Sequence, residues 1–528
     1  MDRNTINKLL FLISFLEGGA VMVIELIGAK IIAPYYGTSL YVWSSVLGVT
    51  LGALALGYFL GGYLSNKYEG YTSLFAVLFL GSIFTALCPI VAPIILNITE
   101  GLGVRLGSLV SVGLYLLPPL VCMGCVSPII IQLITKSKEE SGKTAGLIYS
   151  VSTVGGIIGT FFAGFYLIPI MGIQFSAFLT AGILGFLSLL YFFMKKNNTI
   201  ILTMILIFVA VQSIIPKNKA YSNAETIYKS TGILGEWEVL DVKRQQDKTS
   251  KLQTERKLLL NGIDQTYTQL GFEPLSLWTY PHKITAYSSI KPAGSKALLL
   301  GMGGGSIAYE LLAMGFELDI VEIDERIRHI AKHYFKYDDK KSNLIIDDAR
   351  HYIRNVDIKY DMVIMDIVLG EVQPAHVLSL EGFEDLRAIM KEDGLVIVNF
   401  QGTLYDEEYS LGGKSIFKTM REAGFYTEYY TNPQIEGEEI NYIQDIFFIG
   451  SPTKLNFKDL LSNPRYNEWF PYDSFYYENL VSEKELDLSL AEVLIDDKPK
   501  LELINSKSVV QWRKNKIEEN LKVLRKVE

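Results

Sequence analysis

ALLLGMGGGS, at residues 297–306, is an apolar run that ends in a cluster of glycines. The run predicts a buried strand, and the glycines predict a tight turn before a helix over 306–315. VEID follows at 321–324, at the spacing expected of the next strand. A strand, a glycine turn, a helix and a second strand that ends in an acid are together typical of a nucleoside-binding α/β domain.

Short apolar runs, mostly separated by helix-length stretches, continue this pattern through the second half of the chain. Five of them are candidate parallel strands: KALLL (296–300), ELDIVEI (317–323), NLII (343–346), DMVIMDI (361–367) and GLVIVNF (394–400). The alternation of strand and helix predicts a doubly wound, Rossmann-like α/β domain over residues 291–506. Ligands of such sheets bind beyond the carboxyl ends of the strands, so the residues at those ends are the candidate site.

Glycines and three acids occupy four successive strand ends. They are Gly301, Gly303, Gly304 and Gly305 after the first strand, Glu322 after the second, Asp348 after the third and Asp366 after the fourth. A carboxylate at Glu322 can accept hydrogen bonds from both hydroxyls of a ribose, and Asp348 can accept one from an adenine amino group. Any one of these acids is equally well explained as a helix cap or a surface carboxylate, but together they predict a nucleoside site.

Two further segments flank this domain. Residues 218–290 contain the strand patterns EWEVLDV (236–242) and KLLLNGIDQTY (257–267), and the Asn-Gly pair within the second predicts a tight hairpin turn. We therefore expect a small β-rich lobe there. Residues 507–528 are rich in charge and predict a C-terminal helix.

The first 217 residues are apolar enough to predict a multi-pass bundle of about seven helices in a lipid bilayer. A spanning helix needs about 20 mostly apolar residues, because its backbone polar groups must all be satisfied within the segment. Seven stretches qualify: 9–34, 41–64, 72–96, 107–134, 145–169, 174–194 and 199–215. Glycines recur at close spacing within these stretches, which lets helix backbones approach one another.

Glu17 and Glu25 fall inside the first of these stretches, with Lys30 as the nearest cation in sequence. An ionisable group at membrane depth usually faces a partner or a cavity. A structural pair or a position near the interface explains both residues, and so does a path for a proton or a polar substrate. The sequence leaves these readings open.

The distribution of basic residues predicts that the N-terminus is cytoplasmic in a cell-membrane protein, since cytoplasmic loops are enriched in Lys and Arg. Arg105 is the main basic residue of the opposite loops. Those on the predicted cytoplasmic side are Arg3, Lys8, Lys67, Lys136, Lys138, Lys143, Lys195 and Lys196. Seven spans would place the second half outside the cytoplasm, where a nucleoside-using enzyme lacks its metabolite, so the side of the α/β domain is left open.

The overall composition agrees with a chain made of two classes of protein. The mean hydropathy is +0.24, which is high for a soluble chain, although the sequence holds 49 basic and 57 acidic residues. The net charge is −8, and no excess of basic residues is present that would bind nucleic acid, so we do not expect nucleic acid as a partner. The cysteines Cys88, Cys122 and Cys125 lie in apolar segments without a nearby histidine, so no metal site is expected.

Residues 235–505 resemble class I S-adenosylmethionine-type enzymes, and more narrowly the spermidine synthase family of polyamine aminopropyltransferases. Four sequences carry this resemblance: LLLNGIDQ (258–265), LLLGMGGGS (298–306), VEID (321–324) and YDMVIMD (360–366). The apolar first half, with Glu-Gly-Gly at 17–19 and a glycine-rich second span, is similar to the membrane-fused branch of that family.

The resemblance implies a role for each matching residue. It makes Gln265 a contact of the aminopropyl-donor tail, and it makes the glycine loop and Glu322 ligands of the donor nucleoside. It makes Asp348 an adenine-side ligand and Asp366 the carboxylate that takes a proton from the attacking amine. Tyr280 matches the tyrosine of the amine site.

The acceptor side departs from the family pattern. Gly304 and Leu369 stand where the family has acids. A diamine needs anionic groups for both of its ends, so these changes bear most on acceptor binding. His376, in the loop beyond Asp366, is a candidate for lining the acceptor cleft, although a loop histidine is more often structural. Alternative acids occur in EGEE (436–439) and at Asp473 and Glu478, although a charge run is usually a solvated surface.

The first functional hypothesis is a membrane-anchored aminopropyltransferase that uses decarboxylated S-adenosylmethionine, without a metal, and an amine such as putrescine. The second is a methyltransferase that uses intact S-adenosylmethionine, because the two nucleoside clefts would look alike in sequence. The third is a polyamine transporter or sensor with a degenerate nucleoside-binding domain. The acceptor amine and the formation of a homo-oligomer are left open.

Overall fold

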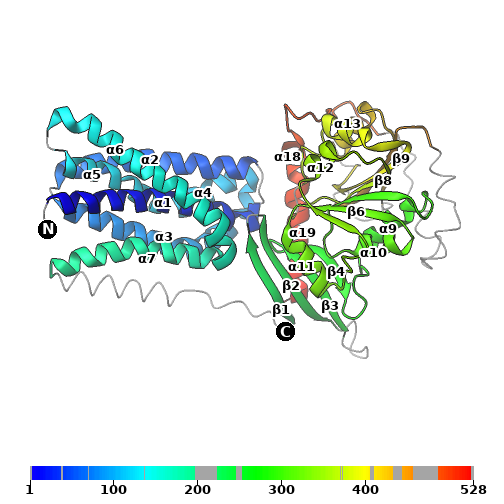
Figure 1. The fold of residues 1–528 in the computed structure, drawn as a ribbon, viewed down its shortest axis with the longest axis horizontal. Coiled ribbons are helices and arrows are strands. Elements are labelled where there is room, and N and C mark those ends of the chain that lie inside the picture. The colour runs from blue at the N-terminus through cyan, green and yellow to red at the C-terminus, as the bar shows by residue number, and fades with distance from the viewer. Residues whose placement is uncertain are drawn as a thin grey trace. The chain divides into compact units, whose positions relative to one another are not determined.

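The computed structural model describes residues 3–36, 40–68, 70–135, 137–196, 223–232, 234–244, 253–368, 370, 373–404, 409–431, 443–455 and 486–524. The chain divides into two compact units, a helical unit within the first 219 residues and an α/β unit that contains most of the remainder (Figure 1). The expected fold class, a helical bundle followed by a Rossmann-like domain, is confirmed.

Five helical segments of the first unit are long and apolar enough to cross a membrane: 5–33, 40–67, 71–99, 105–134 and 141–194. They correspond to α1 (Arg3–Tyr36), α2 (Leu40–Lys67), α3 (Tyr71–Thr99), α4 (Gly103–Gly124) with α5 (Val126–Ile134), and α6 (Ser141–Phe162) with α7 (Ile168–Met194). The first six of the seven stretches expected correspond to these five segments. The seventh, 199–215, lies outside the described residues.

The fifth segment accounts for this difference in number. It is 54 residues long and contains two of the expected stretches. Such a length is about 80 Å of helix, more than twice the hydrocarbon thickness of a bilayer. Gly172 interrupts it with non-helical backbone angles, φ 79° and ψ 170°. Figure 1 accordingly draws α6 and α7 as two rods, and α1 packs against both of them.

Glycines bring α1 and α6 into backbone contact. A Cβ atom added to Gly155 of α6 would lie 2.0 Å from the carbonyl oxygen of Phe15, and one added to Gly18 of α1 would lie 2.0 Å from that of Ser152. No side chain fits in such a space, so the close packing depends on the small residues.

Replacing Gly155 by Ala should therefore force α1 and α6 apart. We expect Gly155→Ala to lower the thermal stability of the detergent-solubilised protein, because overpacking a close contact typically destabilises by about 1–3 kcal/mol. Gly146→Ala is the matched control on the same helix, since its Cβ would meet nothing within 4 Å. Equal melting temperatures for the two variants would contradict the close-packing argument.

The α/β unit begins with the expected small lobe, a four-stranded sheet in the order β1-β2-β3-β4. Its strands are β1 (Ala224–Gly232), β2 (Gly235–Arg244), β3 (Gln253–Leu260) and β4 (Ile263–Gln269). The predicted Asn-Gly turn joins β3 to β4, with φ 51° at Asn261 and φ 80° at Gly262. Positive φ at both central residues is what a two-residue type I′ hairpin turn requires.

The second sheet has seven strands in the order β10-β11-β9-β8-β5-β6-β7. The five expected parallel strands are β5 (Lys296–Leu300), β6 (Glu317–Glu322), β7 (Asn343–Ile346), β8 (Tyr360–Met365) and β9 (Met390–Gly402). The sequence did not predict β10 (Tyr426–Thr431) and β11 (Gln444–Ser451), which add an antiparallel edge beside β9.

Helices bury both faces of this sheet, which explains why its strands are nearly continuous apolar runs. Leu299 of β5 belongs to a core with residues of α9 (Thr279–Ser288), α10 (Ser306–Ala313) and α11 (Glu325–Tyr334). Leu298 and Leu300 belong to the other core, with residues of α12 (Ala349–Asn355), α13 (Leu380–Ala388) and α14 (Leu411–Glu422). The carboxyl ends of β5, β6 and β8 remain as the edge that carries the candidate site.

The C-terminal helices are α18 (Leu501–Ile504) and α19 (Ser506–Leu524), and α19 lies against the small lobe. The side-chain oxygen of Asn520 accepts a hydrogen bond of 2.9 Å from the buried ammonium of Lys257, which also pairs with Asp264 at 3.2 Å. Arg513 donates to the carbonyl oxygen of Asn261 at 3.3 Å. The charged terminal helix thus supplies polar partners to the β3–β4 hairpin.

Candidate active site

The glycine loop between β5 and α10 is held against the end of β8. Gly301 has φ 88°, and a Cβ at this position would lie 2.2 Å from the carbonyl oxygen of Asp366. Gly305 has φ 89° and precedes the first turn of α10. These backbone conformations favour glycine, so the loop can turn sharply and bring its N–H groups close to a ligand.

The small lobe also contacts this loop. The backbone N–H of Gly304 donates a 2.7 Å hydrogen bond to the hydroxyl of Thr266, and a Cβ at Gly303 would lie 3.0 Å from the same oxygen. An acid at position 304 would meet Thr266 and Phe335, because a Cβ there would come within 2.6 Å of the threonine methyl group. Local packing therefore accounts for the glycine at position 304.

Glu322 is the last residue of β6, and its carboxylate contacts the glycine loop. One carboxylate oxygen accepts a 3.1 Å hydrogen bond from the N–H of Met302, and the other accepts a 2.9 Å bond from the N–H of Asp324. Burial raises the pKa of Glu322 to about 7, although these backbone bonds oppose the shift. Each oxygen retains a further lone pair, so the carboxylate can still accept from a ribose.

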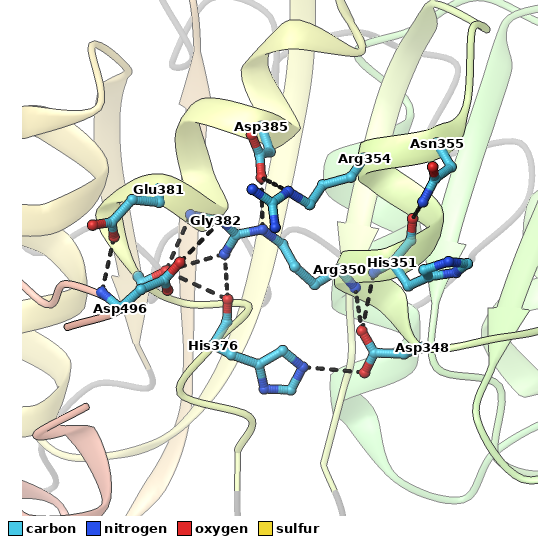
Figure 2. Close-up of polar contacts among 11 residues, drawn as sticks. Asp348, Arg350, His351, Arg354, Asn355, His376, Glu381, Gly382, Asp385 and Asp496 are labelled. Atoms are coloured by element: carbon cyan, nitrogen blue, oxygen red, sulfur yellow. Dashed lines mark hydrogen bonds and ion pairs between the residues drawn. The ribbon is translucent and has the colours of Figure 1, made fainter. Parts of the chain in front are cut away.

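Asp348 is the N-cap of α12. Its carboxylate accepts hydrogen bonds from the N–H groups of Arg350 (2.9 Å) and His351 (3.0 Å). The His376 ring lies 3.1 Å from the other oxygen of Asp348, as Figure 2 shows. Burial raises the pKa of Asp348, but the bonds from His351 and His376 outweigh it, so the pKa lies below its ordinary value.

His376 therefore lies beside the expected adenine-side acid, and none of the described contacts joins it to Asp366. Arg350, which sequence analysis overlooked, fixes the loop that carries His376. Its buried guanidinium bonds to the carbonyl oxygen of His376 and pairs with Asp385 at 2.7 Å and Asp496 at 3.3 Å (Figure 2). In the sequence, the only indication of a role for Arg350 was its position two residues after Asp348.

Asp366 follows β8 and is enclosed by polar partners. The side-chain amide of Asn399 donates a 2.9 Å hydrogen bond to one of its oxygens, and the hydroxyl of Tyr280 lies 3.4 Å from the other. Burial raises the pKa of Asp366, while the bonds from Asn399 and Tyr280 oppose this shift. The structure thus brings together the two residues expected at the amine site and adds Asn399, which was not predicted.

Gln265 links the small lobe to the loop that follows β8. Its side-chain amide donates to the carbonyl oxygen of Gly370 at 3.1 Å. Gln265 therefore lies near the expected donor-tail region. Leu369 lies outside the described residues, as do the alternative acids at 436–439, Asp473 and Glu478.

The helical unit places Glu17 and Glu25 in its interior, where they are 3% and 8% exposed. The hydroxyl of Ser152 donates a 3.2 Å hydrogen bond to Glu17, which ties α1 to α6 next to the close glycine contacts. This geometry agrees with a structural role and leaves the other readings open.

Comparison with known proteins finds a family match within the α/β unit. Residues 284–444 match the family described as the spermine/spermidine synthase domain. This segment is therefore similar to that domain. It includes the glycine loop, Glu322, Asp348 and Asp366.

Several curated relatives carry matching names. The chain is 32% identical over 155 residues to the polyamine aminopropyltransferase of Thermoplasma volcanium, covering 27% of this chain and 56% of that protein. It is 24% identical over 444 residues to polyamine aminopropyltransferase 2 of Aquifex aeolicus, covering 80% of this chain and 84% of that protein. The second alignment is longer than the whole α/β unit, so it includes part of the helical unit.

Another relative has a different name. The chain is 34% identical over 137 residues to the N-terminal histidine N-methyltransferase of Emericella nidulans, covering 24% of each chain. The chain therefore spans between a quarter and about half of the length of several of its relatives. Among solved structures, spermidine synthase from Thermotoga maritima is 18% identical with a TM-score of 0.35, covering 50% of this chain and 80% of that one.

The contact between Gly301 and Asp366 can be tested by substitution. We expect Gly301→Ala to lower the free energy of unfolding by about 1–3 kcal/mol or more, because the methyl group forces the loop away from β8. Gly271→Ala is the matched control, since Gly271 also has positive φ but its Cβ would meet nothing within 4 Å. Thermal unfolding measures both; similar losses would show that backbone strain alone is responsible.

Proposed function

We propose that the α/β unit transfers the aminopropyl group of decarboxylated S-adenosylmethionine to an amine such as putrescine. The half-buried carboxylate of Asp366, bonded to Asn399 and Tyr280 beside the glycine loop, is the observation that carries this proposal. The match to the spermine/spermidine synthase domain and the relatives named polyamine aminopropyltransferase support it.

The reaction joins an amine to the carbon next to a sulfonium. The nitrogen lone pair forms the new C–N bond while the C–S electrons return to sulfur, and methylthioadenosine leaves as a neutral thioether. The product nitrogen then has a proton to lose. Asp366 is suited to accept it because burial raises the pKa of this carboxyl group towards the range in which a general base works well. Tyr280 and Asn399 orient the carboxylate.

The nucleoside part of the donor would be bound by the residues at the ends of the other strands. Glu322 would accept the ribose hydroxyls, and Asp348, fixed by its cap bonds and by His376, would accept the adenine amino group. Gly301, Gly303 and Gly305 would allow close approach of the donor, and Gln265 would contact its aminopropyl tail. None of these roles requires a metal.

The helical unit would anchor the enzyme as a multi-pass protein of the cell membrane. Its five long apolar helices support this part of the proposal. The basic residues of the short loops favour a cytoplasmic N-terminus. Reporter fusions after residues 140 and 225 test the orientation of the chain and the side of the α/β unit.

Methyl transfer from intact S-adenosylmethionine is the second candidate. The alignment with N-terminal histidine N-methyltransferase favours it, because that relative is 34% identical over the aligned residues. The two reactions release different nucleosides, so one assay separates them.

We expect the full-length protein, given decarboxylated S-adenosylmethionine and putrescine, to release methylthioadenosine. Asp366→Asn should lower kcat by about 10²–10⁴-fold, because it removes the proton acceptor. Asp393→Asn is the control, an exposed acid on β9 that pairs with Lys291. Release of S-adenosylhomocysteine from intact S-adenosylmethionine, with no methylthioadenosine from the decarboxylated form, would favour the methyltransferase.

The raised pKa of Glu322 predicts a pH dependence of nucleoside binding. The group is protonated below its pKa of about 7 and ionised above it, and the ionised form accepts hydrogen bonds more strongly. Affinity for methylthioadenosine should therefore rise as pH increases through 7. Glu322→Gln should bind about tenfold or more weakly and lose this dependence, since a lost charged hydrogen bond is worth about 1.5–3 kcal/mol.

The control for this measurement is Glu317→Gln, at the exposed start of the same strand. Isothermal titration calorimetry between pH 6 and 8 compares the three proteins. An unchanged pH dependence in Glu322→Gln would exclude Glu322 as the group responsible.

A further inference from the structure

The acceptor side of the proposed site needs a second anionic group. A diamine such as putrescine carries two nitrogens, and Asp366 serves only the one that reacts. Leu369, three residues after Asp366 in the sequence, is apolar and supplies no charge. An inward-facing acid from another element would restore the missing charge.

Asp445 is such an acid, and it comes from the antiparallel edge of the sheet. The register of β11 on β9 places Asp445 opposite Gln401 and Phe447 opposite Asn399. Residues directly opposite each other share a face of the sheet, as do residues two apart along a strand. Asp445 is therefore on the face that carries Asn399, whose amide bonds to Asp366. Asp445 on β11 and Asp366 after β8 therefore lie on either side of β9.

Asn399 provides an independent sign that a ligand belongs here. Its side chain is 3% exposed, and its amide nitrogen is committed to Asp366. Its amide oxygen is buried and has no hydrogen-bond partner among the residues that the structure describes. A buried acceptor without a donor is unfavourable, so a group with several N–H donors would fit beside it. A primary ammonium has three such donors.

The charges around Asp445 leave it able to bind a cation. Burial and the negative charge of Asp366 raise the pKa of Asp445 to about 6, while Lys516 of α19 and Lys283 of α9 oppose the shift. Asp445 is therefore mostly ionised at neutral pH. Burial lowers the pKa of Lys283, and Asp445 opposes that shift, so each group favours the charged form of the other.

We propose that Asp445 and the side-chain oxygen of Asn399 bind the non-reacting ammonium of a diamine acceptor, while its other nitrogen attacks beside Asp366. This inference rests on the proposed aminopropyl transfer and names the residues that hold the far end of its diamine acceptor. No bond changes at the ammonium end, so Asp445 acts in binding and specificity. A purely structural pair of Asp445 with Lys283 would not distinguish diamines from monoamines.

Steady-state kinetics of the full-length protein with putrescine and with 1-aminobutane test this assignment. For Asp445→Asn we expect the KM for putrescine to rise at least about tenfold with little change in kcat, because an ionic contact made before and during the reaction is lost. The kinetics with 1-aminobutane should be unchanged. Asp393→Asn, at the far end of β9, is the matched control.

The pH profile adds a readout that a structural role would not move. The kcat/KM for putrescine should fall as pH drops through about 6, as Asp445 becomes protonated, and this fall should be weaker in Asp445→Asn. Equal losses for both amines, or no loss for putrescine, would overturn the proposal.

Two further measurements cover the remaining outcomes. If Asp445→Asn fails to fold, Asp445→Glu should shift the preference from putrescine towards the shorter 1,3-diaminopropane. An unchanged ratio of kcat/KM for the two diamines would refute the assignment.

If the wild-type protein releases no methylthioadenosine, the proposed function fails by itself. Calorimetric binding of putrescine to the protein saturated with methylthioadenosine then decides the inference: binding that requires Asp445 supports it, and absent or unaltered binding refutes it.

Discussion

The backbone contact between Gly301 and Asp366 is the constraint on which the rest of the site depends. It holds the end of β5 against the end of β8, at a distance that admits no side chain. The residues proposed to bind the nucleoside extend from one side of this contact, through the glycine loop to Glu322. The residues proposed to bind the acceptor extend from the other side, through Asp366 to Asn399 and Tyr280. A donor carbon and an amine nitrogen can meet only if these two groups keep a fixed separation.

Burial of carboxyl groups gives this edge of the sheet its chemical character. Desolvation raises the pKa of Glu322, Asp366 and Asp445, whereas hydrogen bonds keep the pKa of the capping residue Asp348 low. The edge thus combines an acid that remains ionised with others that titrate nearer neutral pH. Such separation of pKa values between neighbouring acids is a feature of sites that bind cations or move protons.

The parallel core was predictable from the sequence because strands buried on both faces are short, continuous apolar runs. Glu322, Asp348 and Asp366 were found as candidates because each directly follows such a run. The antiparallel strands β10 and β11 were missed, and Asp445 was missed with them, because no strand–helix alternation identifies an edge. Asn399 lies within a predicted strand, but sequence alone does not show that its side chain turns to Asp366.

In the helical unit, too, the sequence predicted the elements but not their contacts. Hydropathy identified its apolar segments, and the repeated glycines predicted close packing, but which helices meet was not encoded in any local pattern. Gly18 and Gly155 are now seen to belong to one crossing, and Glu17 bonds to Ser152 within it.

The acceptor side follows from a balance of charge. Asp366 and Asp445 are two half-buried carboxylates on one face of the sheet, so they repel each other and each raises the free energy of the other's ionised form. A bound diamine would relieve this repulsion, because a cationic nitrogen near Asp445 stabilises the ionised forms of both acids and so keeps Asp366 in the ionised state that can accept a proton. Binding of the far end of the acceptor would in this way prepare the base at its near end. The apolar residue at position 369 is then compatible with diamine chemistry, because Asp445 on β11 would supply the charge.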